Sequence, residues 1–458
     1  MELGIGLTKI IPLIVYLTGI GILFVTLFYK IEFGIYFLIP LLTQQTLLEY
    51  MRDYPGGKDF IDLFFFVLLL KWMLSRQEFR KAPELRGSLS ISIGAIVVWT
   101  FIGLWILTHT FGFPFSISNK AFIHWKNFLM LPLLFLIIVN NVKDEKQIKI
   151  ILTLMAISML YMDRSFYNNF ADKDRSNFDE SLRVGTTFSY LGPNETAVFY
   201  AQNSIVILSL FFFELHKRRK MLFGVTVVFN YWCLMFLYSR GGYLAALVTF
   251  FFFGVTKDRR FLVLLVLGLI FWQTFVPASV QQRIQMSKQG KRGIDSSIAA
   301  RYDMWDQAWE LIKENPILGY GYYATHNLGI ETAGNRKIKK RASLHNGYMQ
   351  LLLDQGLIGL GIFLIFFFIS FRVGWRLFRT AKDPFLKGLG LGFAGCVLAV
   401  LAGNVAGSYW FYLNVSAYYW INLGLVIRGL EITKESELES PQEFQQPKAK
   451  FAAVVHNK

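Results

Sequence analysis

The sequence has little charge and little cysteine for its length. Asp, Glu, Lys and Arg together make up 17% of its 458 residues, whereas an average soluble domain carries about a quarter. The two cysteines, Cys233 and Cys396, lie in apolar runs, so the chain has neither a disulfide framework nor zinc-type spacing. A Walker A loop, His-Glu-x-x-His and Gly-x-Ser-x-Gly are also absent, which argues against the nucleotide-hydrolysing, zinc-peptidase and serine-hydrolase classes.

Long apolar runs take the place of the missing charge, since 54% of the chain is hydrophobic and 45 residues are phenylalanine. A bilayer core of about 30 Å needs roughly 20 apolar residues per helix, so we expect an all-α polytopic membrane protein with 12 or 13 spanning helices. The first run lacks a basic flank and a small-residue cleavage site, so we expect a retained span. The first two runs are close enough for a tight hairpin, and one of them is a candidate re-entrant segment. The expected spans are 9–28, 33–49, 60–74, 88–108, 127–141, 148–163, 194–213, 220–238, 242–256, 260–275, 348–371, 386–404 and 409–428.

Lysine and arginine gather in every second connection between these spans. The basic connections are 71–86, 143–149, 217–220, 257–260 and 372–387. Short basic connections stay on the cytoplasmic side of a bilayer, which also explains the net charge of +16 without a nucleic-acid partner. The remaining connections are therefore expected to face outward, and they are 109–126, 164–193, 239–241, 276–346 and 405–408.

The domain organisation follows from this topology. We expect N-terminal spanning helices over 1–275, a large outer loop over 276–346 and C-terminal spanning helices over 347–430. A cytoplasmic tail over 431–458 is rich in Glu, Gln, Pro and Lys and is expected to be disordered. The two halves of the chain show no internal repeat of the kind that is typical of transporters.

The outer loop 276–346 is basic and contains a helical pattern. It holds eleven Lys/Arg and six Asp/Glu, a net charge of +5. Positive charge outside the membrane has no role in orientation, so an anionic ligand is one interpretation and a merely solvated loop is the other. Ser296 or Ser297 is a candidate cap for a helix that Asn315-Pro316 ends. Its expected apolar face, with Arg301 at the edge, consists of Ile298, Tyr302, Trp305, Trp309 and Ile312.

Tyrosines and a histidine follow this helix. In Gly319-Tyr320-Gly321-Tyr322-Tyr323 the glycines permit tight turns, and the tyrosine rings are candidate surfaces for sugar stacking. Ser343 is a candidate N-cap, which places His345 in the first turn of the next helix. The helix dipole and the neighbouring cations disfavour imidazolium there, and a neutral imidazole can accept a proton. A purely structural histidine is the alternative.

An arginine lies where two apolar runs meet at the outer surface. Ser239-Arg240-Gly241-Gly242 separates these runs, so Arg240 either snorkels to the surface or is held in a cavity by close packing at the glycines. The planar fork of an arginine suits a diphosphate. The outer loop 164–193 adds Arg164, Arg175 and Arg183. It also contains Asp172-Lys173-Asp174, similar to a metal-binding Asp-x-Asp, but this acidic loop faces away from cytosolic nucleotide-sugars and we expect no metal there.

Four motifs in a fixed order resemble the O-antigen ligase/polymerase superfamily. They are Tyr238-Ser239-Arg240-Gly241-Gly242; Arg301 with Met304-Trp305 and Ala308-Trp309; Asn315-Pro316-Ile317-Leu318-Gly319-Tyr320-Gly321; and Leu344-His345-Asn346 with Gly356-Leu357-Ile358-Gly359-Leu360. The resemblance covers roughly Arg183 to Leu360 by motif and the whole chain by topology. These motifs do not separate ligases from polymerases.

The resemblance implies a helical membrane fold of the lipid-dependent glycosyltransferase (GT-C-like) type, with the outer loop over a cavity. It implies a glycan donor on undecaprenyl diphosphate and an acceptor that is a lipid A core, a polysaccharide or a protein. It further implies surrounding membrane lipids, no cofactor, and metal-independent chemistry that inverts the anomeric carbon. Finally, it implies a multi-pass protein of a bacterial inner membrane, with an active site that faces the periplasm.

The resemblance also implies roles for particular residues. Arg240 and Arg301 resemble the diphosphate-binding arginines of the family, and His345 resembles its catalytic histidine. Arg183 resembles an arginine found before a Gly-Thr-x-Phe-type segment, seen here as Gly185-Thr186-Thr187-Phe188. Further candidates for contact with sugar or acceptor are Tyr320, Tyr322 and Asn346.

Other functions remain open at this stage. An O-antigen or exopolysaccharide polymerase would use the same motifs. A polysaccharide transporter or lipid-glycan flippase fits the helix count equally well, although it favours charges near the membrane midplane and duplicated halves. A structural subunit of an export complex would leave the arginine and histidine residues unexplained.

Overall fold

The computed structural model describes residues 7–75, 87–112, 114–286, 296–330 and 343–439. All regular secondary structure in these ranges is helical, which confirms the predicted all-α class. The α-helices are α1 (Leu7–Phe28), α2 (Ile31–Leu41), α3 (Gln45–Met51), α4 (Phe60–Leu74), α5 (Ser88–Phe111), α6 (Lys120–Asn141), α7 (Glu145–Phe170), α8 (Pro193–Phe213), α9 (Lys217–Phe236), α10 (Arg240–Thr256), α11 (Arg260–Ile270), α12 (Trp272–Phe275), α13 (Ala278–Gln285), α14 (Ser296–Glu314), α15 (Gly347–Thr380), α16 (Pro384–Asn404) and α17 (Leu413–Glu439). Short 3-10 helices are η1 (Gly57–Asp59), η3 (Glu180–Leu182), η5 (Ala324–His326) and η6 (Tyr409–Phe411).

Seven of the described helices are long and apolar enough to cross a membrane, namely α1, α5, α6, α7, α8, α15 and α16. The number is eight if α2 and α3, which meet at a bend of 105°, form one broken or re-entrant span. The chain is therefore a multi-pass membrane protein, with fewer such helices than the 12 or 13 predicted. Three of the predicted spans correspond to α4, α10 and α11, which have 15, 17 and 11 residues and are shorter than the roughly 20 residues of a full span. α9 and α17 are long enough, but polar residues such as Asn230 and Arg428 lower their mean hydropathy.

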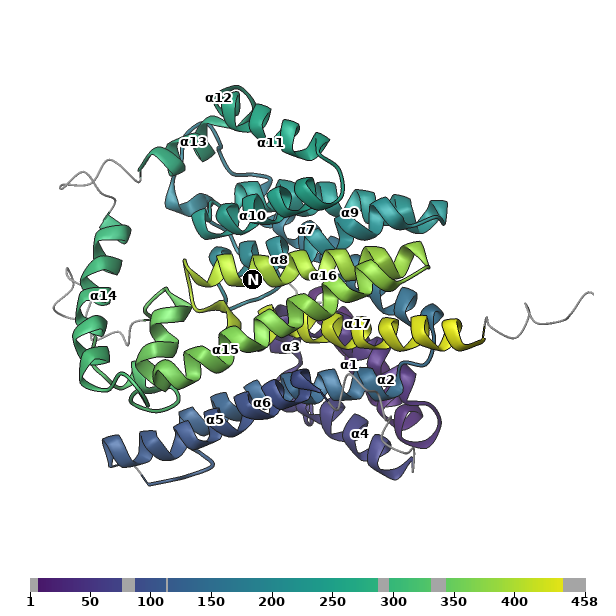
Figure 1. Ribbon diagram of the computed structural model, residues 1–458, viewed down its shortest axis with the longest axis horizontal. Helices are drawn as coiled ribbons and strands as arrows, with labels where there is room; N and C mark the ends of the chain where they lie inside the picture. Colours follow the sequence, from purple (N-terminus) through teal and green to yellow (C-terminus); the bar gives the residue numbers. More distant parts are fainter. Residues whose placement is uncertain (1–6, 76–86, 113, 287–295, 331–342, 440–458) are drawn as a thin grey trace, which may run out of the picture.

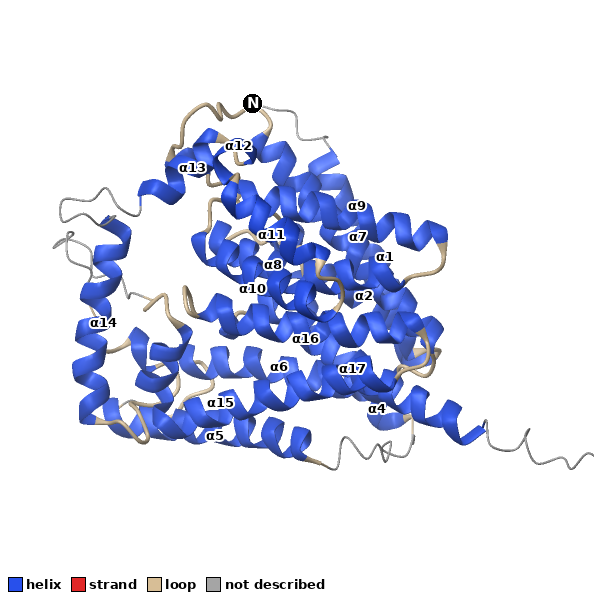
Figure 2. Cartoon of the chain, turned by 45° about the horizontal axis from the view of Figure 1, so that its top comes forward, coloured by secondary structure: helices blue, strands red, loops and turns tan. Residues whose placement is uncertain are grey.

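Most of the long helices run side by side, as Figure 1 shows for α8, α10, α15, α16 and α17. α14 stands crosswise at the left-hand end of this bundle, and Figure 2 shows the same arrangement from a second direction. An apolar cluster joins α14 to the bundle through Leu107 of α5, Ala121 of α6 and Leu344. The described parts of the predicted outer segments 109–126 and 276–346 therefore meet at one end of the bundle.

Two of the predicted cytoplasmic connections, 143–149 and 372–387, meet at the other end. Arg428 of α17 donates to the carbonyls of Val142 (2.7 Å) and Lys143 (2.9 Å), which follow the end of α6. The ammonium group of Lys149 lies 5.1 Å from the ring centroid of Phe385 at the start of α16. This grouping agrees with the predicted alternation of connections, and the assignment of this end to the cytoplasm rests on the positive-inside argument.

The predicted disordered tail at 431–458 begins too early. α17 continues to Glu439, because Arg428 forms an ion pair with Glu431 and the hydroxyl of Thr433 donates to the carbonyl of Gly429 (2.8 Å). Both Arg428 and Thr433 are buried, so packing against the bundle extends the helix beyond its apolar part. The remaining residues of that prediction, 440–458, lie outside the described ranges.

α14 confirms the helix predicted between Ser296 and Asn315, but its buried face differs from the predicted one. Met304, Ala308 and Ile312 are buried at helical spacing. Tyr302 and Trp309, which the pattern placed on the apolar face, are 50% and 49% exposed. The small Ala308 permits close approach to the bundle, so the bulky rings lie at the edges of the contact.

The segment that follows α14 packs against a kink in α15. Gly356 has a φ of 64° and a ψ of −169°, which breaks the helix. The N–H groups freed by this break are satisfied by the preceding segment, since Leu357 donates to the carbonyl of Pro316 (2.8 Å). In return, Tyr320 donates its N–H to the carbonyl of Leu353 (2.9 Å), and Gly321 donates to that of Asp354 (2.8 Å). Two of the four sequence motifs therefore bind each other through their backbones.

Gly356→Ala should destabilise the fold. A Cβ at this position would collide with the carbonyl oxygen of Ile317, and the positive φ is unfavourable for alanine. We expect the free energy of unfolding to fall by about 1–3 kcal/mol, the usual cost of a strained backbone. The measurement is the thermal midpoint in detergent, which should be lower than that of the wild type. Gly361→Ala, on the same helix with open space around its Cβ position, is the matched control. Equal midpoints for the two variants would contradict this account of the kink.

Candidate functional site

Residues 406–409 form a turn that follows α16 and runs into the first residue of η6. Three other helices, α10, α14 and α15, contact this turn. Arg301 of α14 donates from Nη1 to the carbonyl of Ala406 (3.3 Å). Gly347, the first residue of α15, donates its N–H to the carbonyl of Gly407 (3.0 Å). Gly241 of α10 packs so closely that an added Cβ would lie 2.6 Å from the Cβ of Ala406. This 406–409 turn therefore brings distant parts of the sequence together at the α14 end of the bundle.

His345 lies immediately before α15 and not in its first turn as predicted. The N-cap of α15 is Asn346, whose Oδ1 accepts from the N–H groups of Tyr348 (3.0 Å) and Met349 (3.1 Å). The predicted cap, Ser343, accepts instead from the N–H of His345 (3.3 Å). His345 has a φ of 49°, a left-handed conformation that surrounding contacts must hold in a residue with a side chain.

His345 is half-buried beside the cation on α14. Burial lowers its pKa to about 4, and the guanidinium of Arg301 contributes to the same effect. The imidazole is therefore neutral at pH 7, as predicted, although burial is the main cause and not the helix dipole. Trp305, one turn after Arg301, donates its indole N–H to the carbonyl of Leu344 (2.7 Å). α14 thus holds the residue before His345 in place.

The low pKa of His345 predicts how stability changes with pH. The unfolded chain has an ordinary histidine pKa of 6.5, whereas the folded value is about 4. Between these values the unfolded state binds a proton that the folded state does not, so stability falls as the pH drops from 6.5 to 4. We expect the thermal midpoint of the wild type to fall more between pH 7 and pH 5 than that of His345→Gln, which carries no titrating group there. An equal fall of the thermal midpoint with pH in the two proteins would contradict a lowered pKa of His345.

Arg240 is the first residue of α10 and follows its N-cap, Ser239. The hydroxyl of Ser239 accepts from the N–H of Gly242 (3.4 Å). Gly242 packs on Ala197 of α8, where an added Cβ would lie 2.6 Å from the Cβ of Ala197. The glycine pair therefore produces the close helix packing that the sequence predicted. Arg240 stands one residue before the contact of Gly241 with the 406–409 turn.

Arg183 belongs to a second cluster, which we call the Glu180 cluster (Glu180, Arg183, Asn194 and Arg283). Nη2 of Arg183 donates to Oδ1 of Asn194 (2.9 Å), and its Nη1 pairs with Glu180 (3.2 Å). Glu180 also pairs with Arg283 of α13 (3.3 Å). One carboxylate thus bridges two guanidinium groups, which leaves a net charge of +1.

The Glu180 cluster contacts the segment that leads to Arg240. The guanidinium of Arg283 lies 4.9 Å from the ring centroid of Phe178, and this ring packs on Tyr238 at 5.1 Å. The hydroxyls of Tyr238 and Ser279 are hydrogen-bonded (3.1 Å). Arg283 was not among the site residues predicted from the sequence, where it is one of eleven Lys/Arg in the outer loop 276–346.

Tyr409 links the two groups of arginines electrostatically. Burial and the carboxylate of Glu195 raise the pKa of its hydroxyl, while Arg301 and Arg183 act in the opposite direction. Tyr409 therefore stays protonated at neutral pH, and its hydroxyl donates to the carbonyl of Ala406 (3.5 Å). Neither Tyr409 nor Glu195 was predicted as a site residue from the sequence, because only the fold brings them near the arginines.

Tyr320 and Tyr322, the predicted sugar-contacting rings, are buried in the apolar cluster under α14. The hydroxyl of Tyr320 donates to Glu314 (2.7 Å), and the N–H of Tyr322 donates to the carbonyl of Gly103 (2.9 Å). Burial leaves neither ring a face on which a sugar can stack, so we assign both to packing. Asn346, the third predicted contact residue, serves as the N-cap of α15.

Tyr323, the last residue of the same motif, is placed differently. Its ring is half-buried and contacts the imidazoles of His124 and His326, with centroid separations of 4.3 and 3.8 Å. Burial is the main cause of the raised pKa of the Tyr412 hydroxyl, followed by the carboxylate of Glu195, and Tyr190 and Tyr323 add smaller effects. Among the tyrosines of this motif, Tyr323 is therefore the least buried, since Tyr320 and Tyr322 are both buried.

The Asp172-Lys173-Asp174 segment has an ordinary local role. Oδ1 of Asp174 accepts from the N–H (2.9 Å) and the hydroxyl (2.7 Å) of Ser176, and these bonds hold the pKa of the Asp174 carboxyl below its usual range. Within the described ranges, no group of three or more His, Cys, Asp or Glu side chains is arranged to hold a metal ion.

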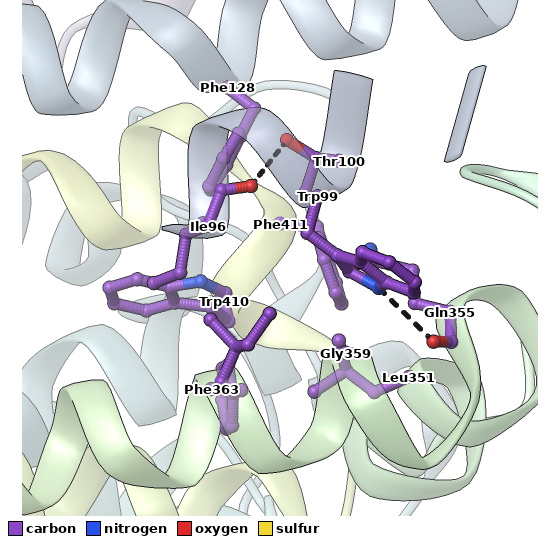
Figure 3. Close-up of a pocket in the computed structure, with 11 residues that line it drawn as sticks. Ile96, Trp99, Thr100, Phe128, Leu351, Gln355, Gly359, Phe363, Trp410 and Phe411 are labelled. Carbon is purple, nitrogen blue, oxygen red and sulfur yellow. Dashed lines mark hydrogen bonds between the residues drawn. The ribbon is translucent and has the colours of Figure 1, made fainter. Parts of the chain in front are cut away.

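A narrow apolar cavity lies between α5, α6, α15 and the residues that follow Tyr409. Figure 3 shows Phe363, Trp410 and Phe411 among the side chains that line it. The indole of Trp99 donates to the carbonyl of Gln355 (3.2 Å), next to the kink of α15. The cavity gives the 406–409 turn a water-poor boundary on the bundle side, where charges interact more strongly than in water.

These features define a multi-pass helical membrane protein with arginines, a neutral histidine and a protonated tyrosine at one end of its bundle. The family model described as O-Antigen ligase matches residues 225–364. This segment runs from α9 into α15 and contains Arg240, Arg301 and His345, whereas Arg183 lies before it. The predicted resemblance is thereby confirmed over these residues, and it supports a function of the O-antigen ligase or polymerase type.

The chain is also similar to a protein of Haemophilus influenzae described as "Uncharacterized protein". The two are 24% identical over 173 residues, which cover 34% of this chain and 43% of the relative. The chain thus spans less than half of the length of that relative, and the similarity adds no activity to the argument.

Proposed function

We propose that the protein transfers a glycan from an undecaprenyl-diphosphate-linked donor to an acceptor hydroxyl at the outer face of a bacterial inner membrane. One observation carries this proposal. Arg301 lies close enough to His345 to contribute to the low pKa of its imidazole, and both residues belong to the segment that matches the O-antigen ligase family. A base beside a cation is the arrangement that transfer from a diphosphate requires.

In the proposed reaction, the acceptor oxygen attacks the anomeric carbon on the face opposite the diphosphate. The bond from that carbon to the diphosphate oxygen breaks as the glycosidic bond forms, which inverts the configuration. The hydroxyl proton passes to His345. The electron pair of the broken bond leaves with the lipid diphosphate.

The leaving diphosphate gains negative charge, and the cationic residues are proposed to stabilise it. Arg301 and Arg240 would each present two N–H groups to phosphate oxygens. Tyr409 would add a neutral O–H donor, since its hydroxyl stays protonated. Donors that are already oriented in a water-poor site stabilise a developing charge without reorganisation. The Glu180 cluster, which includes Arg183, would extend the positive potential towards the approaching donor.

Donor binding would also adjust the base. In the free protein, the guanidinium of Arg301 contributes to the low pKa of His345. A bound diphosphate would neutralise this positive charge. It also places negative charge near the imidazole. Both changes raise the pKa of His345 towards the working pH, where a general base is most effective.

The test is transfer by the purified full-length protein in vesicles that contain an undecaprenyl-diphosphate oligosaccharide and a candidate acceptor. We expect a new glycosidic bond and stoichiometric release of undecaprenyl diphosphate, both measured by mass spectrometry. Movement of the donor across the bilayer with no bond formed would support a transporter and overturn the proposal.

We propose a ligase, with a polymerase as the alternative within the same class. Deletion of the gene separates the two through the glycan on the cell surface. Loss of long chains from their lipid or protein anchor indicates a ligase, whereas chains that stop at a single repeat unit indicate a polymerase.

A further inference from the structure

A polar pocket opens at the end of the bundle opposite to α14. It is formed by the ends of α1, α4 and α6 and the start of α2, and its volume is about 100 Å³. α6 relates the two ends of the molecule, because its first turn packs in the cluster under α14 and its last residue, Asn141, lines the pocket. A helix of 22 residues is about 33 Å long, so about the thickness of a bilayer core separates this pocket from the candidate active site.

The lining of this pocket carries positive charge. Three lysines line it, Lys30, Lys71 and Lys143, together with a single carboxylate, Glu32. Glu32 is already engaged, since Lys143 pairs with it at 3.2 Å and the side-chain amide of Gln147 donates to it at 3.4 Å. Lys30 and Lys71 therefore give the pocket a charge of +2 that these contacts do not balance. An anion is the ligand class that such a lining selects.

An apolar surface borders the lysines. Phe28 and Tyr29 at the end of α1, and Met73 and Leu74 at the end of α4, are between 63% and 77% exposed. Aromatic residues at the end of a spanning helix are typical of the boundary between hydrocarbon and headgroups. The pocket therefore lies at headgroup depth, with acyl chains expected against its apolar border.

We propose that this pocket binds the phosphate group of an anionic phospholipid. Lys30 and Lys71 contact the phosphate, and the exposed side chains of α1 and α4 contact the acyl chains. The apolar border favours a lipid over a free phosphate ion, because an ion would gain nothing from it. Basic pockets between helices on the cytoplasmic side are a known mode of headgroup recognition. This proposal is independent of the transfer reaction, and either can fail without the other.

The experiment measures thermal unfolding of the purified full-length protein in a neutral detergent. Phosphatidylglycerol, phosphatidylcholine and inorganic phosphate are added separately to the wild type and to the Lys30→Gln/Lys71→Gln variant. We expect phosphatidylglycerol to raise the midpoint of the wild type and the other two additions to have little effect. The variant should lose most of this increase, and Lys30→Arg/Lys71→Arg should retain it.

The control is Lys217→Gln/Arg218→Gln, which removes two exposed cations at the start of α9, outside the pocket. Its response to phosphatidylglycerol should equal that of the wild type. An undiminished response in Lys30→Gln/Lys71→Gln would overturn the site, and an equal response to inorganic phosphate would overturn the lipid as its ligand. If the double variant does not fold, the single variants Lys30→Gln and Lys71→Gln should each show a reduced response, and a full response in both would overturn the proposal.

Discussion

Replacing His345 by alanine should lower the rate of glycan transfer by about 10²–10⁴-fold, the usual contribution of a general base. The side chain is half-buried and its pKa of about 4 keeps it neutral at pH 7, so the variant loses a proton acceptor and not a binding charge. Donor affinity should therefore be nearly unchanged. The measurements are kcat for transfer in vesicles and equilibrium binding of the lipid-linked donor.

His109→Ala is the matched control for this variant. His109 lies in the last turn of α5, at the α14 end of the bundle, and is exposed. It should transfer at the wild-type rate. If His345→Ala is also fully active, then His345 is not the base and the proposed mechanism is wrong.

Arg301→Gln should lower transfer by about 10²–10³-fold, the effect of removing one oriented donor from a charge-stabilising site. A second effect follows from the position of the guanidinium beside His345. Because Arg301 contributes to the low pKa of His345, its removal should move the acid limb of kcat/KM to higher pH. The limb should remain below the ordinary histidine value of 6.5, since burial is the larger cause.

The shift of the acid limb separates an electrostatic role from a purely structural one. Arg301 also donates to the carbonyl of Ala406, so a loss of rate alone could come from displacement of the 406–409 turn. Lys313→Gln is the control on the same helix, because Lys313 is exposed and pairs only with Glu310 among the described contacts. A slow Arg301→Gln variant with an unmoved acid limb would argue against the proximity of the two side chains.

The helical content of the outer loop could be predicted because its signals are local. The spacing of apolar residues and the Asn315-Pro316 stop are properties of a few consecutive residues, and α14 ends at Glu314 as expected. The face that packs could not be predicted as well. Which side of α14 touches the bundle depends on Leu107 of α5 and Ala121 of α6, which are remote in sequence.

The position of His345 relative to α15 depends on which of two residues caps that helix, and the sequence does not decide between them. Ser343 and Asn346 are both good N-caps, and the choice of Asn346 coincides with the hydrogen bond from Gly347 to Gly407 of the 406–409 turn. That bond joins two segments 60 residues apart in the sequence. A neutral His345 was predicted from the helix dipole and the cations next to it in the sequence, which lie outside the described residues, whereas the main cause in the structure is burial, a property of the fold.

The burial of Tyr320 and Tyr322 was not visible in the glycine–tyrosine pattern. The pattern predicted exposed rings on tight turns, and tight turns are present, with positive φ at Gly319 and Gly321. The backbone of this segment is hydrogen-bonded to α15 at the kink at Gly356, and Tyr322 also donates its N–H to Gly103 of α5. A sequence can show that a kink-forming glycine exists, but not which segment will bind there.

The two contacts of α14 have a consequence for the candidate site. Arg301 and Trp305 lie one turn apart, and they hold the 406–409 turn and the residue before His345 respectively. Under the proposed mechanism, the same helix would therefore support both the counter-charge for the leaving diphosphate and the base, so a displacement of α14 would remove the two together.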